Sequence, residues 1–262
     1  MSEARSFYDD AELYDRVGTP PAASVDFYVE LARSAHGDVL ELACGTGRVT
    51  IPIAQALAAQ AGRAVAGLDL APAMLDAARA KGTTAGVAPD FVLSDMRRFA
   101  LGRRFELIFV AFNSLLHLMT NEALAECFAC VREHLAPGGT FAFDVFNPSV
   151  EMLARSPSER TTVVRVPDDT LGEIHVEATM NYDAATQVNR STFHFSAPGR
   201  ADYMTVPIHL RSLFPLELPL LLSANEFRLE ARYGDFGREP FESGSARQVC
   251  ICRVADASPL AR

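Results

Sequence analysis

Between Asp38 and about Asn147, short apolar runs alternate with amphipathic or alanine-rich segments, and this alternation limits the fold more than any other feature of the sequence. The apolar runs are Val39 to Ala43, Ala64 to Leu70, Asp90 to Leu93, Glu106 to Phe112 and Thr140 to Phe146. The segments between them are Val49 to Gln60, Ala73 to Lys81 and Asn121 to Leu135. Such alternation predicts an α/β fold in which helices cover both faces of a mostly parallel sheet.

After Pro148 the pattern changes to strand-like segments without intervening helices. These segments are Thr161 to Val166, Ile174 to Tyr182, Gln187 to Ser196 and Met204 to Ser212, and turn residues such as Pro167-Asp168-Asp169 separate them. We expect an antiparallel insertion over residues 149–212, laid over one edge of the first sheet. A helix at Pro215 to Ala224 and strands at Arg228 to Tyr233 and Ala246 to Val254 then return the chain to a main domain of residues 1–148 and 213–262.

Charge and composition narrow the classes of partner. The formal charge is -9, and Lys81 is the only lysine among 24 basic residues, so no polybasic stretch is present to neutralise a nucleic-acid backbone. The first thirty residues lack a signal-like apolar run, and prolines interrupt the oily stretch from Leu213 to Leu222. We therefore expect a cytoplasmic protein, a monomer or homodimer, that binds neither nucleic acid nor membrane.

Cysteines offer one possible metal site. Cys127, Cys130 and His134 share one side of the helix expected from Asn121, but a fourth ligand is missing and apolar residues flank them. A structural helix face is the preferred interpretation over zinc, and no metal is expected. The five cysteines, an odd number without regular spacing, suit free thiols in a reducing compartment. Thr120 or Asn121 can cap this helix, and Pro137-Gly138-Gly139 is expected to end it.

A glycine loop, Cys44-Gly45-Thr46-Gly47, follows the first strand and leads directly into a helix. Such a turn offers backbone N–H groups and a positive helix end to a ligand, and glycine lets the ligand approach closely. Asp69, 22 residues beyond Gly47, ends the next strand, where a carboxylate can accept both hydroxyls of a ribose. Thr50 stands where a dinucleotide fingerprint would have its third glycine, which disfavours NAD.

Together, VLELACGTGRVT at residues 39–50, GLDLAPAML, SDMRRF, FELIFVAFNSLLHL and HLAPGGTFAFDVFNP resemble, in order and spacing, the motifs of class I S-adenosylmethionine-dependent methyltransferases. The resemblance covers roughly residues 36–148. It implies a Rossmann-like seven-stranded methyltransferase fold, with the insertion as an antiparallel β lid, and S-adenosyl-L-methionine as the cofactor. Glu41 is the acid of the loop motif and is expected to organise the loop from behind.

The resemblance implies a set of residues that contact the cofactor: Tyr14, Glu41, Ala43, Gly45, Gly47, Asp69, Leu70, Met74, Asp95, Met96 and Phe112. Within this set, Asp69 would hold the ribose, and Leu70 and Met74 would pack on the adenine. Asp95 would accept from the exocyclic amine of the adenine with the Met96 backbone beside it, although a turn cap alone would also explain an aspartate there. The Phe112 carbonyl would bind the methionine ammonium, and the backbone of the glycine loop would contact the rest of the methionine half.

A sulfonium methyl group needs an in-line nucleophile at about 3–3.5 Å and no metal. An amine nucleophile must be neutral, and a nearby base helps to remove its proton. His117, four residues after Asn113, is the candidate base, because FNSLLHL resembles the matching stretch of aminosugar N,N-dimethyltransferases. FYDDAELYD resembles their leading helix, so Tyr14, with Tyr8 behind it, is expected near the transferring methyl group. His117 could instead pack a helix start, and the tyrosines could be amphipathic anchors.

The acceptor is expected to be a small molecule. Amino-methyltransferases of nucleic acids usually carry an (Asp/Asn)-Pro-Pro-aromatic loop after the fourth strand, but Asn113-Ser114-Leu115-Leu116 stands there in this sequence. Asn147 and four polar insertion residues are candidates for lining the pocket: His194, Tyr203, His209 and Arg211. We hypothesise methyl transfer to nitrogen, with Asn113, His117 and Tyr14 in the catalytic site. Transfer to oxygen or carbon, and a cofactor-binding module without catalysis, are the alternatives.

Overall fold

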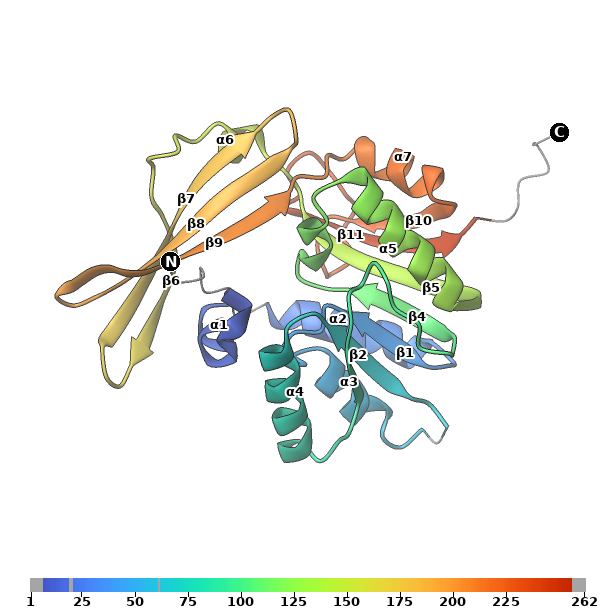
Figure 1. The fold of residues 1–262 in the computed structure, drawn as a ribbon. Helices are drawn as coiled ribbons and strands as arrows, with labels where there is room; N and C mark the ends of the chain where they lie inside the picture. Colours follow the sequence, from blue (N-terminus) through green and yellow to red (C-terminus); the bar gives the residue numbers. More distant parts are fainter. Residues whose placement is uncertain (1–6, 19–20, 61, 256–262) are drawn as a thin grey trace.

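The computed structural model describes residues 7–18, 21–60 and 62–255. Its main sheet has seven strands in the order β10-β11-β5-β4-β1-β2-β3 (Figure 1). Their bounds are β1 Val39–Leu42, β2 Val65–Asp69, β3 Asp90–Leu93, β4 Phe105–Val110, β5 Leu135–Phe146, β10 Phe227–Tyr233 and β11 Arg247–Val254. Strands β5, β4, β1, β2 and β3 run parallel, and β11 is antiparallel to both β5 and β10. The predicted mostly parallel seven-stranded sheet is confirmed.

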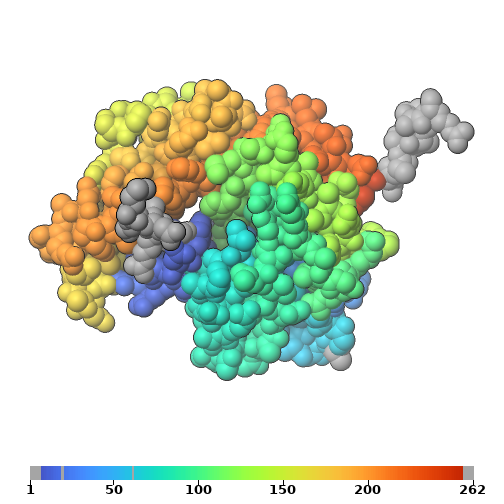
Figure 2. Space-filling view, viewed as in Figure 1, coloured from blue at the N-terminus to red at the C-terminus, as the bar shows by residue number. Residues whose placement is uncertain are grey.

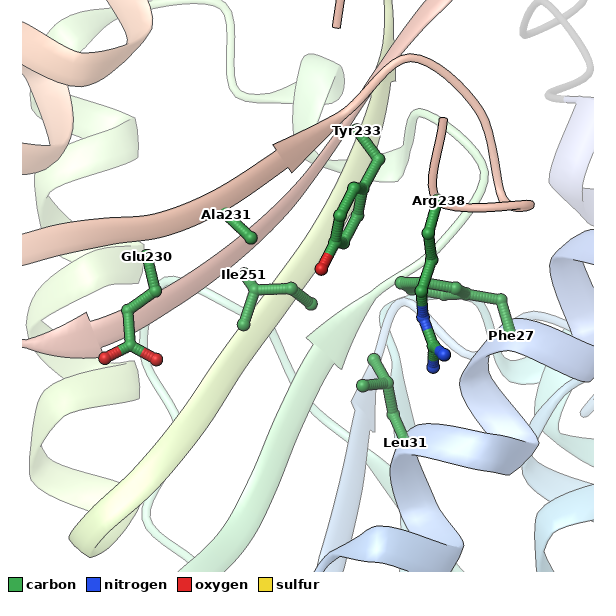
Figure 3. Close-up of a pocket in the computed structure, with 7 residues that line it drawn as sticks. All are labelled: Phe27, Leu31, Glu230, Ala231, Tyr233, Arg238 and Ile251. Carbon is green, nitrogen blue, oxygen red and sulfur yellow. The ribbon is translucent and has the colours of Figure 1, made fainter. Parts of the chain in front are cut away.

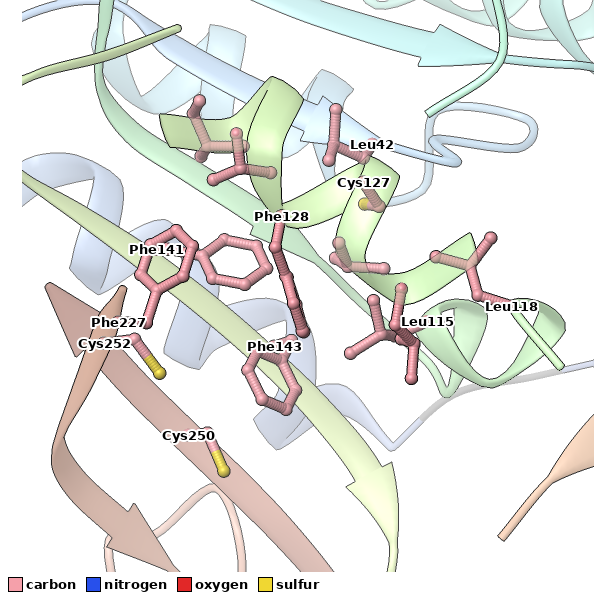
Figure 4. Close-up of a cluster of buried hydrophobic side chains, with 14 of the residues drawn as sticks. Leu42, Leu115, Leu118, Cys127, Phe128, Phe141, Phe143, Phe227, Cys250 and Cys252 are labelled. Atoms are coloured by element: carbon pink, nitrogen blue, oxygen red, sulfur yellow. The ribbon is translucent and has the colours of Figure 1, made fainter. Parts of the chain in front are cut away.

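Helices cover both faces of this sheet because successive strand residues point to opposite sides. Val39 packs with the helices α2 (Ala22–Ser34) and α3 (Thr50–Leu57), whereas Leu40 packs in the cluster around α5 (Asn121–His134) and α7 (Glu217–Ala224). Figure 4 shows the second cluster, where Phe128 of α5 lies among phenylalanines of β5 and β10. Two further helical elements of this domain are α4 (Pro72–Thr84) and the short η2 (Ser114–His117). The sequence analysis did not anticipate α2.

The end of α5 differs from the expectation. Thr120 caps its start as predicted, accepting from the Ala123 N–H at 3.1 Å. The helix stops at His134, before the proline-glycine stretch, and Leu135 already has the extended backbone of β5. The register between β4 and β5 then shifts across residues 136–139, since Phe105 pairs with Leu135 but Leu107 pairs with Thr140. The proline and glycines therefore form an irregular strand entry and do not end the helix.

The cysteine-rich side of α5 belongs to the hydrophobic core. Cys127 has no exposed surface, and the Cys130 thiol donates to the Arg97 carbonyl. His134 uses both ring nitrogens: Nδ1 bonds the Cys130 carbonyl at 2.8 Å and Nε2 accepts from the Leu101 N–H at 3.1 Å. These are the contacts of a packed helix face, and all five cysteines are free thiols.

The insertion is a separate four-stranded antiparallel sheet in the order β6-β7-β8-β9, entered through the short helix α6 (Val150–Leu153). Its strands are β6 Thr161–Asp168, β7 Gly172–Asp183, β8 Val188–Ala197 and β9 Arg200–Arg211. Instead of covering an edge of the main sheet, one face of the insertion packs on η1 (Phe7–Asp9) and α1 (Ala11–Val17). Figure 2 shows these N-terminal residues in blue between the insertion and the main domain.

Candidate active site

The loop after β1 has an unusual backbone. Ala43, Gly45 and Gly47 have φ angles of 54°, 53° and 78°. This is the left-handed region, which residues other than glycine rarely occupy. A Cβ atom on Gly45 would lie 3.6 Å from the Tyr14 hydroxyl, so the phenol of α1 lies directly over the loop. At Gly47 a Cβ atom would lie 2.9 Å from Ile51. The loop therefore forms a tight curve, and its backbone at Gly45 lies close to the Tyr14 side chain.

Asp69 ties the tip of β2 to this loop. Its Oδ2 accepts from the Gly45 N–H at 2.8 Å, and its Oδ1 accepts from the Ala71 N–H at 2.9 Å. Burial raises the pKa of Asp69, and these backbone bonds partly oppose that shift. Because an ionised carboxylate has about four acceptor positions, it can still accept from further hydroxyls.

Glu41 lies beneath the loop, only 3% exposed. It accepts a hydrogen bond from the Thr50 hydroxyl, so it fixes the first residue of α3. Burial raises the pKa of Glu41 to about 8, although the bond from Thr50 lowers it. Its position fits the organising role that the resemblance implied, and the role itself stays a prediction.

The expected adenine side is open and apolar. Leu70 and Leu93, at the tips of β2 and β3, are 68% and 56% exposed. Met74 has no exposed surface, so it is placed as a core residue behind this tip. The Asp95 carboxylate accepts from both the backbone and the guanidinium of Arg97, which holds its pKa below the usual value. Asp95 therefore does cap a turn, and its contact with adenine remains a prediction.

Two consecutive residues with left-handed backbone lie in the turn between β4 and η2. Phe112 and Asn113 have φ angles of 55° and 62°. The Phe112 N–H donates to Asp144 Oδ1 at 2.9 Å, and the same oxygen accepts from the Tyr28 hydroxyl at 2.7 Å. Asn113 Oδ1 accepts from the Phe146 N–H at 2.6 Å. The Asn113 side chain thus connects the turn after β4 to β5. Only its NH₂ group is then left for the predicted catalytic role.

His117, at the end of η2, is hydrogen-bonded to Tyr8. The Tyr8 hydroxyl and His117 Nε2 are 2.8 Å apart, and the rings meet edge to face with centroids 5.5 Å apart. Burial lowers the pKa of His117, and burial also raises that of Tyr8. Both groups are therefore neutral at pH 7, and the tautomer of the imidazole decides which of them donates. The structure brings Tyr8 to the histidine and Tyr14 to the glycine loop.

The polar insertion residues are dispersed. Arg211 is buried and bonds Asn121 and Glu217, while His194 bonds Thr179 at 2.9 Å. His209 is exposed. Arg200 stacks on Tyr203. Asn147 donates to the Ser245 carbonyl, which explains it as a turn residue.

A cavity lies apart from the glycine loop and His117. It has a volume of about 320 Å³ and lies between α2 and the strands β10 and β11 (Figure 3). Its charged residues already have partners, since Arg238 pairs with Glu30 and Glu230 pairs with Arg228 and Arg253.

Among the described residues, each helix is too short or too polar to cross a bilayer.

Residues 39–139, which include both left-handed segments, match a family model described as a methyltransferase domain. This part of the chain is therefore similar to a methyltransferase domain. The CcbJ methyltransferase from Streptomyces caelestis has a similar structure, with a TM-score of 0.80 and 28% identity over 96% of this chain and 99% of that one. An S-adenosylmethionine-dependent methyltransferase from Clostridium acetobutylicum, at 19% identity, has a TM-score of 0.74 over 94% of this chain and 98% of its own, which shows the fold alone.

Two curated relatives are named as aminosugar enzymes. The chain is 34% identical over 140 residues to dTDP-3-amino-3,4,6-trideoxy-alpha-D-glucopyranose N,N-dimethyltransferase of Streptomyces venezuelae, and these residues are 50% of this chain and 54% of the relative. It is 31% identical over 173 residues to dTDP-3-amino-3,6-dideoxy-alpha-D-glucopyranose N,N-dimethyltransferase of Streptomyces fradiae, 60% of this chain and 63% of the relative. The chain thus spans little more than half the length of these relatives. The predicted fold is confirmed, and the match of residues 39–139 agrees with the predicted enzyme class and cofactor.

Several residues of this methyltransferase site were missed. Asp144 and Tyr28 support the turn after β4, and Asp15 and Arg48 join α1 to the glycine loop. A signal for Asp144 was present, because a carboxylate inside the apolar run FAFDVF must be paired or hydrogen-bonded when buried. Arg48 stood within the loop motif itself. Nothing in the sequence indicated which acid of FYDDAELYD would reach it.

Proposed function

We propose that the protein transfers a methyl group from S-adenosylmethionine to the amino nitrogen of a small molecule, an amino sugar or its nucleotide derivative. The observation that carries this proposal is the neutral, half-buried His117 hydrogen-bonded to Tyr8 at the end of η2. The names of the two aminosugar N,N-dimethyltransferases give the acceptor class.

The described residues fit this cofactor. The left-handed backbone at Ala43, Gly45 and Gly47 forms a curve without large side chains, as close approach of a ligand requires. Asp69 has acceptor positions for a ribose, and Leu70 offers apolar surface for an adenine ring. When bound, S-adenosylmethionine supplies a methyl group on a positively charged sulfur, already activated for transfer.

Protein groups then have to orient and deprotonate the acceptor. His117 is neutral at pH 7. In the tautomer whose Nε2–H donates to the Tyr8 hydroxyl oxygen, Nδ1 carries no proton and can take the one that the nitrogen loses as its bond to carbon forms. Tyr8 holds the imidazole in place, as the hydrogen bond to Nε2 shows. Tyr14 covers the loop, where it would exclude water from the transfer site. The NH₂ group of Asn113, three residues after β4, would contact the acceptor. The insertion, residues 149–212, closes the acceptor pocket from the opposite side through its contact with η1 and α1.

The decisive experiment uses trideuteromethyl-labelled cofactor with a panel of amino sugars and dTDP-amino sugars, read by mass spectrometry. We expect one or two labelled methyl groups, and fragmentation should place them on nitrogen. His117→Ala should abolish labelling while calorimetry still shows S-adenosylhomocysteine binding. Label on oxygen or carbon would refute the nitrogen acceptor. Cofactor binding without transfer to any panel member or to a metabolite extract would favour the non-catalytic module.

A further inference from the structure

Asp15, on α1, gathers three partners from the main domain. Its carboxylate accepts from the Thr46 hydroxyl at 2.7 Å, from the Arg48 guanidinium at 3.1 Å and from the Lys81 ammonium. Thr46 and Arg48 belong to the glycine loop and its exit, and Lys81 belongs to α4. Burial raises the pKa of Asp15, but these bonds and charges outweigh it and hold the pKa below the usual value. Asp15 is therefore an ionised anchor of α1 on the cofactor loop.

The Arg48 guanidinium, which bonds Asp15 through Nε and Nη2, also contacts Tyr14. Its Nη2 donates to the Tyr14 carbonyl at 2.9 Å, and its central carbon lies 4.7 Å from the centroid of the Tyr14 ring. One planar guanidinium thus contacts the backbone and the aromatic face of one residue while Asp15 fixes its orientation. The side chains of Arg48 and Asp15 are only 16% and 26% exposed, so solvent screens this pair incompletely.

We propose that Arg48, oriented by Asp15, is a positioning residue that sets the Tyr14 phenol over the glycine loop. The assignment rests on the proposed function, because Tyr14 matters for turnover only if it lies at the transfer site. A lysine cannot replace this group, since an ammonium is a point charge and lacks the planar fork that spans the carboxylate, the carbonyl and the ring.

The test begins with a local reporter. The chain contains no tryptophan, so Glu12→Trp on the exposed side of α1 gives a single emitter whose anisotropy reports the mobility of that helix. Adding Arg48→Met should lower the anisotropy, and adding Arg48→Lys should lower it partly. Arg228→Met, which removes an exposed ion pair with Glu230 on the edge strand β10, is the matched control and should leave it unchanged.

Kinetics separate positioning from general destabilisation. Arg48→Met should reduce kcat about tenfold or more, because a misplacement of about 1 Å can cost up to about a hundredfold, whereas KM for the acceptor should change less than threefold. In a Tyr14→Phe background the same substitution should cost less than twofold, because its effect passes through Tyr14.

Two results would overturn the proposal: unchanged anisotropy in the Arg48→Met variant, or an equal loss of kcat in both backgrounds. If Tyr14→Phe alone leaves turnover intact, the role of Tyr14 in the proposed function fails. In that case a lowered anisotropy still supports the placement of Tyr14 by Arg48. The two failures are therefore distinguishable.

Discussion

At the scale of single residues, the burial of His117 sets its protonation. Burial holds the pKa of His117 below the ordinary value of about 6.5, so we expect its ring to stay neutral at pH 7. The measurement is a titration of the histidine Cε1–H signals by NMR, with the His117 signal assigned as the one lost in His117→Gln. A midpoint at or above that ordinary value would contradict this environment. Tyr8→Phe, which keeps the ring but removes the bond to Nε2, is the control for the hydrogen bond.

Glu41 gives a second prediction at this scale, on stability. Its pKa rises from 4.5 to about 8 in the fold, so the folded state binds a proton that the unfolded state has lost between those values. The stabilisation is therefore complete below pH about 4.5 and is lost as pH rises through about 8. We expect the free energy of unfolding to decline across this window in the parent and to decline less in Glu41→Gln, measured by urea denaturation. Equal slopes in the two proteins would show that Glu41 does not titrate in this way.

At the scale of elements, one hydrogen bond of α2 supports the turn after β4. The Tyr28 ring stacks on Phe109 with centroids 4.6 Å apart, and its hydroxyl bonds Asp144, which in turn holds the Phe112 N–H. Tyr28→Phe keeps the stack and leaves the buried Asp144 short of a donor. We expect a loss of about 1–3 kcal/mol of stability and weaker binding of S-adenosylhomocysteine by calorimetry. Tyr233→Phe, at the cavity on the same face of the sheet, should change neither.

Elements within the alternation of strands and helices were predictable, whereas the helix that precedes it was not. Parallel strands buried on both faces read as continuous apolar runs, which is why β1, β2 and β4 were found. The helix α2 was missed, although its side chains Phe27 and Tyr28 are buried, because the sequence around them follows no strand and carries no motif. The site followed the same rule: Asp69 and Gly45 come from local motifs, while the bond from Tyr8 to His117 joins residues 109 positions apart.

At the scale of the whole molecule, the N-terminal segment joins two bodies. Neighbouring residues of α1 point to opposite partners: Asp15 bonds the glycine loop, and Arg16 bonds Asp168 and the Pro167 carbonyl of the insertion. The sequence predicted the insertion but not its position, because its apolar face could have covered any unpartnered surface. The structure shows that Phe7 and Val17, from the start of the chain, fill that face. The glycine loop, α1 and the insertion are therefore joined by direct side-chain contacts.

This connection predicts how the molecule responds to a cavity. Phe195 has no exposed surface and lies wholly in the cluster that joins the insertion to η1 and α1, whereas Phe143 lies in the cluster of the main sheet. Phe195→Ala removes contacts worth about 3–5 kcal/mol, and we expect faster hydrogen exchange in β7 to β9 and α1 with β1 and β4 still protected. KM for the acceptor should rise more than the dissociation constant of S-adenosylhomocysteine. Phe143→Ala should give the converse exchange pattern, with protection lost first in the main sheet. If hydrogen exchange in Phe195→Ala instead became faster in both sheets to the same extent, the insertion and the main sheet would unfold together. In that case α1 would not open independently of the main sheet.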